Sequence, residues 1–362
     1  MRQGRISKVV KIGGFSHVNP VFIGGDNPVV VQTMWKDRLS IEDIDNAASK
    51  IEELGAMGCG LLRFAVPDIT SAEVLGALSQ IVKMPLVADI HFDYKIALRC
   101  LDFPIAKIRI NPGNIGSKDK VYSVLEKAAS RNIPIRIGVN AGSLPKDHKM
   151  DTAEALVQAA LRELDIFKEF GFTGFLVSMK ASGIADTISA NRILSSRTDA
   201  PLHIGVTEAG PLTAGVARNT AALLTLLNEG IGDTIRVSLS DTMENEIIAG
   251  REILAAAAAL ASENARMGHP GVNIISCPRC GRYGFDTHGF TSRWLSRLYA
   301  LNKDITVAIM GCEVNGPGEA KHADLGITGA GDRVLIFKHG SVIKTITADL
   351  ADVVFEEELN KL

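Results

Sequence analysis

Apolar runs of strand length alternate with amphipathic segments of helix length through the first two thirds of this chain. The first helical segment is Ile41–Met57, for which Ser40 is placed as the N-cap, and the second lies near Thr70–Val82. The predicted strands are Val29–Met34, Gly60–Val66, Pro85–Ile90, Lys107–Ile110, Ile133–Val139, Gly174–Met179, Leu202–Val206 and Thr234–Leu239. Eight β/α units within roughly 240 residues have the size and rhythm of a TIM barrel, so the pattern predicts an α/β fold with a (β/α)8 barrel.

An open, doubly wound sheet is the competing interpretation of the same pattern. It is disfavoured because no Gly-rich dinucleotide fingerprint follows the first strand. Two short strands, within Lys8–Gly14 and Pro20–Asp26, precede the repeat. They predict a hairpin that closes one end of the barrel.

A second domain is predicted after an Ala-rich helix, Thr242–Met267, which ends at Gly268-His269-Pro270. We therefore expect a barrel over residues 1–267 and a smaller C-terminal α+β domain over residues 268–362. The elements expected in the smaller domain are strands Val272–Ser276, Thr306–Met310, Arg333–Lys338 and Ser341–Thr345, and helices Thr291–Leu301 and Ala348–Leu362.

The composition excludes several classes of protein. Apolar residues make up 46% of the 362 residues, which suits a packed α/β protein and not a disordered one. The formal net charge of −2 argues against binding to nucleic acid or to a membrane surface, because both need a basic excess. No apolar stretch approaches the length of a signal peptide or a membrane span, so we expect a cytoplasmic protein whose cysteines stay reduced.

Polar side chains collect where the predicted strands end. Arg109 and Asn111 stand at alternate positions, hence on one face, and Arg236 and Ser238 repeat that spacing. The expected mouth residues are Arg63, Asp89, His91, Arg109, Asn111, Arg136, Asn140, Lys180, Glu208, Arg236 and Ser238. Because the carboxyl ends of barrel strands form one mouth, we expect these side chains to converge there.

The arginines and the lysine at this mouth need anions as partners. Few carboxylates stand at the strand ends, chiefly Asp37, Asp89 and Glu208, so internal salt bridges cannot account for the whole set. Arginine binds phosphate through two parallel hydrogen bonds, and a substrate with about two phosphates is therefore predicted. By contrast, His203, Cys59 and Cys100 are interpreted as core side chains.

Three cysteines lie in the last quarter of the chain. Cys277 and Cys280 form a C-x-x-C pair, and Cys312 follows a short strand that breaks at Gly311. The usual fourth cysteine of an iron–sulfur cluster is missing, and a turn carries Glu319 back towards Cys312. We therefore expect Cys277, Cys280, Cys312 and Glu319 to hold an iron–sulfur cluster. Structural zinc is the alternative, with His288 or His322 completing a Cys3His site.

Five segments together give the chain a family resemblance. They are Pro85-Leu-Val-Ala-Asp-Ile-His-Phe-Asp-Tyr, Ile108-Arg-Ile-Asn-Pro-Gly-Asn, Arg136-Ile-Gly-Val-Asn-Ala-Gly-Ser, Cys277-Pro-Arg-Cys-Gly-Arg and Gly311-Cys-Glu-Val-Asn-Gly-Pro-Gly-Glu. The chain resembles the bacterial 4-hydroxy-3-methylbut-2-enyl diphosphate synthases over nearly its whole length. It departs from the family at Met34–Asp37, where relatives more often have a Thr/Asn-rich run.

The resemblance implies an activity and a set of roles. The activity is reductive opening of 2-C-methyl-D-erythritol 2,4-cyclodiphosphate in isoprenoid precursor biosynthesis, with one [4Fe-4S] cluster per chain and flavodoxin or ferredoxin as electron donor. The cluster ligands implied are Cys277, Cys280, Cys312 and Glu319. Residues matching the diphosphate-binding positions are Arg63, Arg109, Asn111, Arg136, Lys180, Arg236 and Ser238, and His91 is placed with them. Asn140 and Glu208 match polar groups near the reacting carbons, and we expect them to be catalytic.

Two other classes of protein stay open. The mouth also resembles that of pterin-binding barrels such as dihydropteroate synthase, which would carry a structural zinc domain and no redox chemistry. A non-enzymatic zinc scaffold fits the crowded mouth less well.

The domain order also constrains the assembly, because the last barrel helix runs away from the mouth and a linker of four residues cannot return to it. We therefore expect a homodimer with shared active sites, in which the small domain of one chain serves the barrel of the other.

Overall fold

The computed structural model describes residues 5–143, 151–260, 271–301 and 303–362. The chain divides into two compact units, Met1–His269 and Pro270–Leu362, which are described separately here. The boundary expected between residues 267 and 268 lies outside the described residues.

Eight parallel strands form the core of the first unit, in the order β8-β7-β6-β5-β4-β3-β10-β9. A parallel bridge between Val177 and Leu202 joins β8 to the start of β9 and closes the ring. The strands are β3 (Val30–Met34), β4 (Leu61–Ala65), β5 (Leu86–Asp89), β6 (Lys107–Ile110), β7 (Ile135–Asn140), β8 (Phe175–Lys180), β9 (His203–Ile204) and β10 (Thr234–Ile235). This arrangement confirms the predicted (β/α)8 barrel.

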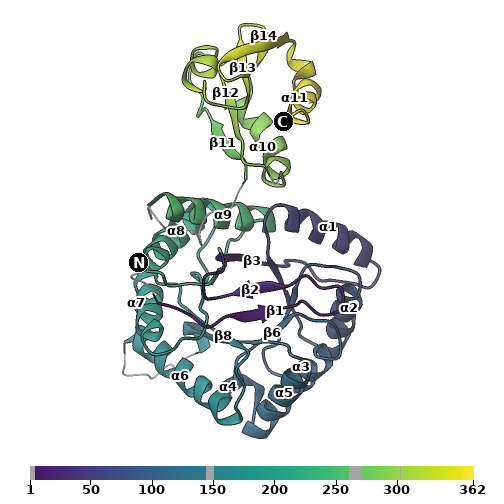
Figure 1. The fold of residues 1–362 in the computed structure, drawn as a ribbon, viewed down its shortest axis with the longest axis vertical. Helices are drawn as coiled ribbons and strands as arrows, with labels where there is room; N and C mark the ends of the chain where they lie inside the picture. Colours follow the sequence, from purple (N-terminus) through teal and green to yellow (C-terminus); the bar gives the residue numbers. More distant parts are fainter. Residues whose placement is uncertain (1–4, 144–150, 261–270, 302) are drawn as a thin grey trace. The chain divides into compact units, whose positions relative to one another are not determined.

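Helices surround the strands, as Figure 1 shows. They are α1 (Ile44–Ala56), α2 (Ile69–Ser79), α3 (Tyr94–Cys100), α4 (Pro112–Ile115), α5 (Lys118–Ser130), α6 (Thr152–Phe170), α7 (Ile184–Ser195), α8 (Leu212–Asn228) and α9 (Met243–Leu260). The part of the expected last helix beyond Leu260, residues 261–267, lies outside the described residues.

The predicted start of the first helix is wrong. Helix α1 begins at Ile44 with Asp43 at its N-cap position, three residues beyond Ser40. Ser40 Oγ donates to Asp43 Oδ2 at 2.8 Å, so the serine hydroxyl bonds a side chain and does not cap the helix backbone. Residues 41–43 form a turn before the helix.

A hairpin closes the amino-terminal end of the barrel, as predicted. Strands β1 (Val10–Ile12) and β2 (Val21–Ile23) pair antiparallel. Their buried side chains pack on Leu61, Val87, Ala106 and Leu176, near the starts of the barrel strands. Ser7 Oγ donates to Asp233 Oδ1 at 2.7 Å, which fastens the chain entering β1 to the residue before β10.

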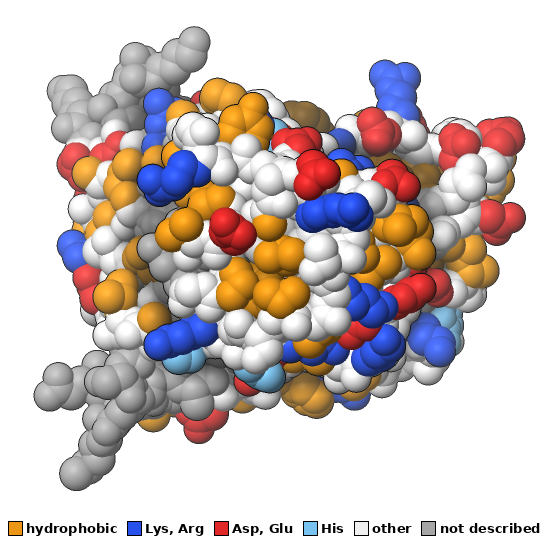
Figure 2. All heavy atoms as spheres, turned by 90° about the horizontal axis from the view of Figure 1, so that it is seen from above, with side chains coloured by type: hydrophobic (Ala, Val, Ile, Leu, Met, Phe, Trp, Pro, Cys, Tyr) orange, Lys and Arg blue, Asp and Glu red, His pale blue; other side chains and the backbone are white. Residues whose placement is uncertain are grey.

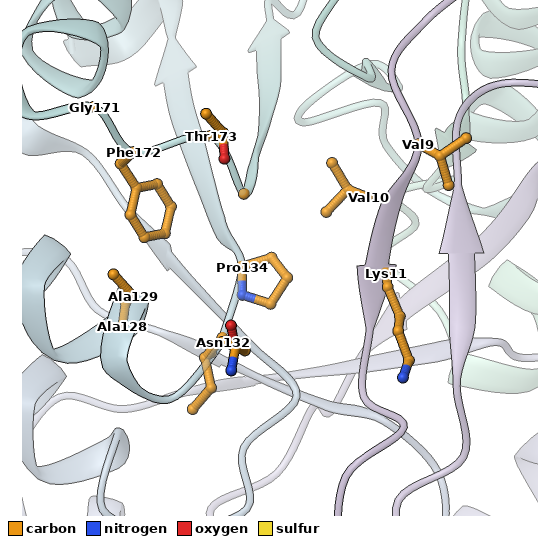
Figure 3. Close-up of a pocket in the computed structure, with 12 residues that line it drawn as sticks. Val9, Val10, Lys11, Ala128, Ala129, Asn132, Pro134, Gly171, Phe172 and Thr173 are labelled. Atoms are coloured by element: carbon orange, nitrogen blue, oxygen red, sulfur yellow. The ribbon is translucent and has the colours of Figure 1, made fainter.

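A surface pocket of about 370 Å³ adjoins this hairpin (Figure 3). It lies between Val9, Val10 and Lys11, at the start of β1, and the turns that follow α5 and α6. Helix C-termini and strand starts surround it, so it belongs to the end of the barrel opposite the strand C-termini.

The second unit contains a five-stranded mixed sheet in the order β11-β12-β13-β14-β15. The strands are β11 (Asn273–Ser276), β12 (Thr306–Met310), β13 (Leu325–Ala330), β14 (Arg333–Lys338) and β15 (Ser341–Ile346). Helices α10 (Thr287–Tyr299) and α11 (Ala351–Leu359) meet at an aromatic cluster in which Phe355 packs edge-on against Phe290 and Trp294, with ring centroids 5.1 and 4.9 Å apart. The expected α+β character is confirmed.

Strand β13 was missing from the prediction although it is the central strand of this sheet. Two glycines, Gly326 and Gly329, interrupt its apolar pattern. A Cβ on Gly326 would lie 2.0 Å from the Phe337 ring, and one on Gly329 would lie 2.5 Å from the Gly284 backbone. The glycines are required by close packing, which a sequence pattern does not reveal.

The surface mixes charges of both signs. Figure 2 shows Lys and Arg side chains interspersed with Asp and Glu on the face in view. Exposed pairs such as Arg293 with Asp352, at 3.0 Å, are part of this mixture. Within the described part of the chain, no helix is long and apolar enough to cross a membrane.

Packing at Gly326 gives a stability prediction. Replacing Gly326 with alanine should lower the free energy of unfolding of the second unit by about 2 kcal/mol, because the new methyl group collides with the buried Phe337 ring. Denaturant unfolding measures this change. Gly281→Ala is the matched control, since a Cβ there meets open space, and it should stay within about 0.5 kcal/mol of the unmodified protein. Equal stability of the two variants would contradict the packing argument.

Candidate functional site

A small pocket of about 70 Å³ lies at the carboxyl ends of the barrel strands. Its lining residues are Arg63, Asp89, His91, Arg109, Arg136, Asn140, Ser178, Lys180, Thr207, Arg236 and Ser238. Eight of the sequence-predicted substrate or catalytic residues are thereby brought together, from β4 around the ring to the segment after β10.

Strand register explains why these side chains meet. In the parallel pairs, Arg109 stands opposite both Asp89 and Arg136, and Asn140 stands opposite Lys180. Paired residues on neighbouring parallel strands lie at the same level along the barrel axis, and their side chains point to the same side of the sheet. Residues far apart in the sequence therefore lie in one layer. Glycine at 138 leaves room for one of them, since a Cβ there would lie 2.2 Å from Arg109 Nε.

Asp89 is the carboxylate that lines the pocket. It is buried, accepts a hydrogen bond from Arg109 Nη1 at 3.1 Å, and lies 3.5 Å from Arg63 Nε. Burial alone would raise the pKa of Asp89, but attraction to Arg63, a hydrogen bond with His91 and attraction to Arg109 outweigh it and hold this pKa well below its usual value. Asp89 is therefore ionised at neutral pH and offsets part of the positive charge.

Arg136 is buried without enough acceptors. Its Nη1 donates to Ser178 Oγ at 3.1 Å, whereas Nε and Nη2 have no partner in the described structure. Burial, followed by repulsion from Arg63 and Arg109, lowers the pKa of Arg136 well below its usual value. Unsatisfied buried N–H groups of this kind mark a place where an acceptor from outside the chain is expected.

Lys180 presents a second buried cation to the same pocket. It is 4% exposed. Burial lowers its pKa well below the usual value, and Arg136 and Arg236 add repulsion. A Cβ at position 205 would lie 2.9 Å from Lys180 Nζ, so Gly205 makes space for the amine.

A buried carboxylate that sequence reasoning missed stands behind the pocket. Glu246, on the first turns of α9, is 1% exposed and accepts hydrogen bonds from Arg236 Nε and Nη2, both at 3.3 Å. Burial would raise the pKa of Glu246, but Arg236 and the groups that hydrogen-bond to it lower it overall. Its position could have been found, because Glu246 shares the buried face of the helix with Met243, Ile247 and Gly250.

Ser178 and Thr207 were missed as well. Ser178 lies two residues before Lys180 on β8, hence on the same face, and this spacing was the available signal. Thr207 follows the short strand β9, and its backbone N–H donates to Ala181 O at 3.1 Å. Both add neutral hydrogen-bonding groups to a pocket whose five cations face one lining carboxylate. The arrangement is suited to binding a compact polyanion.

Two predicted site residues do not line this pocket. Asn111 is buried and occupies the N-cap position of α4. Glu208 is exposed in the loop after β9, with a φ of 54°, a conformation that residues other than glycine seldom adopt. Their side chains are next to the pocket in sequence but outside its lining.

The expected core residues are buried as predicted. His203 is fully buried, with Nδ1 2.6 Å from Thr234 Oγ1, and burial lowers its pKa well below the usual value. Cys59 and Cys100 are buried free thiols, and burial raises the pKa of each to about 12. Such thiols are unreactive at neutral pH.

The other three cysteines belong to the second unit. Cys277 directly follows β11, and Cys312 follows the end of β12 by two residues. These strands are parallel neighbours, and Cys277 N donates to Ile309 O at 3.0 Å. A Cβ on Gly311 would lie 3.8 Å from Cys277 Sγ, so the two cysteine segments are in contact. Cys312 is buried, Cys277 is partly buried, and Cys280 is exposed.

No metal site is assembled from side chains that the structure describes. Within them, there is no group of three or more His, Cys, Asp or Glu residues placed to hold a metal ion. The Glu319 side chain is outside the described set, although the π-helix Val314–Glu319 places its backbone after Cys312. His288 and His322, the alternative zinc ligands, are exposed. Three thiols at the ends of two adjacent strands fit the donor chemistry of an iron–sulfur cluster.

Comparisons with known proteins cover both units. Residues 15–251 match the family model described as the GcpE TIM-barrel domain, and residues 273–361 match that of the GcpE protein C-terminal domain. The 4-hydroxy-3-methylbut-2-en-1-yl diphosphate synthase (flavodoxin) of Treponema denticola is 49% identical over 99% of this chain and 96% of its own length. The protein of the same name from Thermodesulfovibrio yellowstonii is 44% identical over 94% of this chain and 96% of its own.

One solved structure illustrates the reach of the barrel fold. The dihydropteroate synthase of Xanthomonas albilineans, solved with 4-aminobenzoic acid, has a TM-score of 0.50 and 12% identity, covering 71% of this chain and 99% of its own. At this level of identity the likeness shows the fold alone.

The unpaired donors of Arg136 give a prediction with two opposite effects. Arg136→Met should raise the free energy of unfolding by about 1 kcal/mol or more, because an uncompensated buried charge is removed. The same variant should bind inorganic pyrophosphate more weakly by about 2 kcal/mol, because charge-assisted hydrogen bonds are lost. Denaturant unfolding and calorimetry measure the two effects. Arg192→Met, at an exposed pair with Glu229, is the control and should change neither. Unchanged pyrophosphate affinity in Arg136→Met would place the anion elsewhere.

Proposed function

The chain belongs to the GcpE family, and we propose that its barrel pocket binds 2-C-methyl-D-erythritol 2,4-cyclodiphosphate for reductive ring opening to 4-hydroxy-3-methylbut-2-enyl diphosphate and water. The protein is a 4-hydroxy-3-methylbut-2-enyl diphosphate synthase, an iron–sulfur oxidoreductase of isoprenoid precursor biosynthesis. The observation that carries the substrate assignment is the set of five cations around a pocket lined by a single carboxylate.

The proposed substrate suits this charge distribution. A cyclic diphosphate carries one negative charge on each phosphate, and these charges can replace the acceptors that Arg136 lacks. Lys180 and Arg236 stand on neighbouring sides of the same pocket. We assign Arg63, His91, Arg109, Asn111, Arg136, Lys180, Arg236 and Ser238 to substrate binding. Arg109, Arg136 and Lys180 are buried, so a charge-assisted hydrogen bond from any of them to phosphate is stronger than it would be at the surface.

Glu208 and Asn140 are proposed to act at the reacting carbons. Asn140 lines the pocket and can orient the substrate by hydrogen bonding. Glu208 is exposed beside the mouth, so its carboxyl group is accessible to a substrate hydroxyl and can pass a proton to the leaving oxygen. The reaction releases water, and this protonation completes the leaving group.

Two electrons are needed for the ring opening, and no side chain can supply them. We propose one [4Fe-4S] cluster per chain, held by Cys277, Cys280, Cys312 and Glu319, which supplies single electrons when bound. Flavodoxin, which the names of the curated relatives specify, is the proposed donor in preference to ferredoxin. We place the enzyme in the cytoplasm, where cysteine thiols stay reduced.

We propose a homodimer with shared sites, in which residues 268–362 of one chain serve the barrel of the other. Within the barrel unit, α9 starts beside the pocket, where Glu246 bonds Arg236, and continues for 18 residues to Leu260. A helix of that length carries the chain about 27 Å along its axis, away from the mouth. This direction supports the proposal that a second chain supplies the cysteine unit.

A pterin-dependent transferase with a zinc domain is not favoured. The likeness to dihydropteroate synthase extends to 71% of this chain at 12% identity, whereas the curated diphosphate synthases match nearly the whole chain at 41 to 49% identity. The barrel is shared, and the cysteine unit belongs to the GcpE family.

Turnover and iron content test the proposed function. Anaerobically purified protein should be coloured, contain about four irons per chain, and convert the cyclic diphosphate when given reduced flavodoxin. Cys280→Ser should lose the cluster, because a thiolate ligand is removed. Glu319→Ala should keep some cluster but lose most turnover. A colourless zinc protein without turnover would refute the assignment, and full turnover by Glu319→Ala would remove Glu319 from the ligand set.

Subunit mixing tests the shared site. Glu208→Gln chains, defective in the barrel, are mixed with Cys277→Ser chains, defective in the cluster, under conditions in which subunits exchange. Random pairing makes half of the dimers mixed, each with one intact site, so about a quarter of the unmodified activity should return. If both variants stay inactive although exchange is demonstrated, each site is built within one chain.

A further inference from the structure

Lys36, in the loop after β3, reaches the back of the cation pocket. Its Nζ donates to Glu246 Oε1 at 2.7 Å and to Leu239 O at 2.8 Å. Lys36 lines a neighbouring crevice with Trp35 and Phe64 and is absent from the lining of the cation pocket.

The hydrogen bonds to Glu246 are unequal in length. Thr33 Oγ1 donates to Oε2 at 2.6 Å, and Lys36 Nζ and the Leu239 N–H donate to Oε1 at 2.7 and 3.0 Å. Both contacts from Arg236 are longer, at 3.3 Å each. Strong charge-assisted hydrogen bonds measure about 2.7–2.9 Å. The bonds from Arg236 to Glu246 are therefore weak, whereas Thr33 and Lys36 form the short bonds to this carboxylate.

The weakness of the Arg236–Glu246 ion pair depends on how the negative charge of Glu246 is shared between Lys36 and Arg236. Glu246 is 1% exposed, so water cannot screen it. One carboxylate is shared by two cations, because Glu246 Oε1 lies 2.7 Å from Lys36 Nζ and 3.3 Å from Arg236 Nη2. Without the charge of Lys36, the whole attraction of Glu246 would act on Arg236 and draw the guanidinium into a closed ion pair. An incoming phosphate would then have to break that pair.

We propose that Lys36 is a positioning residue, which shares the charge of Glu246 and so keeps Arg236 available to a phosphate of the substrate. The identity of that phosphate ligand rests on the proposed function. The contacts among Lys36, Glu246 and Arg236 are present in the structure and do not rest on the proposed function.

Steady-state kinetics of Lys36 variants test the proposal. Lys36→Met should raise KM for the cyclic diphosphate about tenfold and leave kcat within about twofold, because binding energy is lost equally from the bound substrate and the transition state. Lys36→Gln keeps a donor but loses the charge and should match Lys36→Met. Lys36→Arg keeps the charge and should restore KM to within about twofold. Normal KM in Lys36→Gln, or loss of kcat with KM unchanged, would overturn the proposal. Since Lys36 is partly exposed, these variants are expected to fold.

A double-mutant cycle identifies Glu246 as the intermediary. In a Glu246→Gln background, Lys36→Met should change KM by less than about twofold, because there is no carboxylate charge left to share. The same tenfold loss in both backgrounds would mean that Lys36 acts on the substrate directly, and would refute the positioning role. The matched control is Lys50→Met with Glu244→Gln, a second Lys–Glu pair between α1 and α9, which should leave KM unchanged.

Failure of the proposed function would be seen separately. If the unmodified enzyme does not turn over the cyclic diphosphate, calorimetry with inorganic pyrophosphate replaces the kinetics. Lys36→Met should then weaken pyrophosphate binding about tenfold, with the same rescue by Lys36→Arg. Equal pyrophosphate affinity in the unmodified protein and Lys36→Met would overturn the positioning role even though the substrate had been misassigned.

Discussion

Positive charge is enclosed at the carboxyl ends of the barrel strands, and the placement of the carboxylates in the first unit depends on it. Burying a charge is costly unless it is paired, and five cations line a pocket that contains one carboxylate, Asp89. A second carboxylate, Glu246, is recruited from the outer helix layer, where it is buried on the inner face of α9. The remaining deficit is visible as Arg136 donors that have no acceptor. A closed ring of parallel strands holds these groups in one layer although they repel one another, because the backbone hydrogen bonds of the barrel do not depend on side-chain charge.

The parts of the fold that the sequence could predict are those that follow from periodicity. Strand positions and the convergence of Arg63, Arg109 and Arg136 follow from a period of two and from the parallel register of a barrel. Glu246 is not among the predicted site residues because it lies on the buried face of a helix and not at a strand end. Strand β13 was missed because Gly326 and Gly329 are needed for packing against residues distant in sequence. The Ser40 cap failed because a competing side-chain acceptor, Asp43, lies within reach, and propensity rules do not weigh such local competition.

The two units divide the chemistry by the kinds of atom that each can supply. Nitrogen donors for an anion come from barrel strands, which give a rigid, register-determined layer. The thiols of Cys277, Cys280 and Cys312, which we propose as cluster ligands, lie in the segments that follow β11 and β12. The same barrel architecture occurs in a dihydropteroate synthase. A fold does not by itself determine a function, so function has to be argued from the residues at the site.

The absence of side chains at Gly138 and Gly205 has an evolutionary consequence. A Cβ at position 138 would take the space now occupied by Arg109 Nε, and a Cβ at position 205 would collide with the Arg236 backbone oxygen as well as crowd Lys180 Nζ. A side chain at position 138 is therefore possible only after Arg109 has been replaced, whereas Arg109 can be replaced while the glycine stays. A descendant that acquired a side chain at position 138 would first have to lose the long arginine at 109. The intermediate form without this arginine would bind an anion more weakly. The steric contact between positions 138 and 109 thus sets the order in which the two can change.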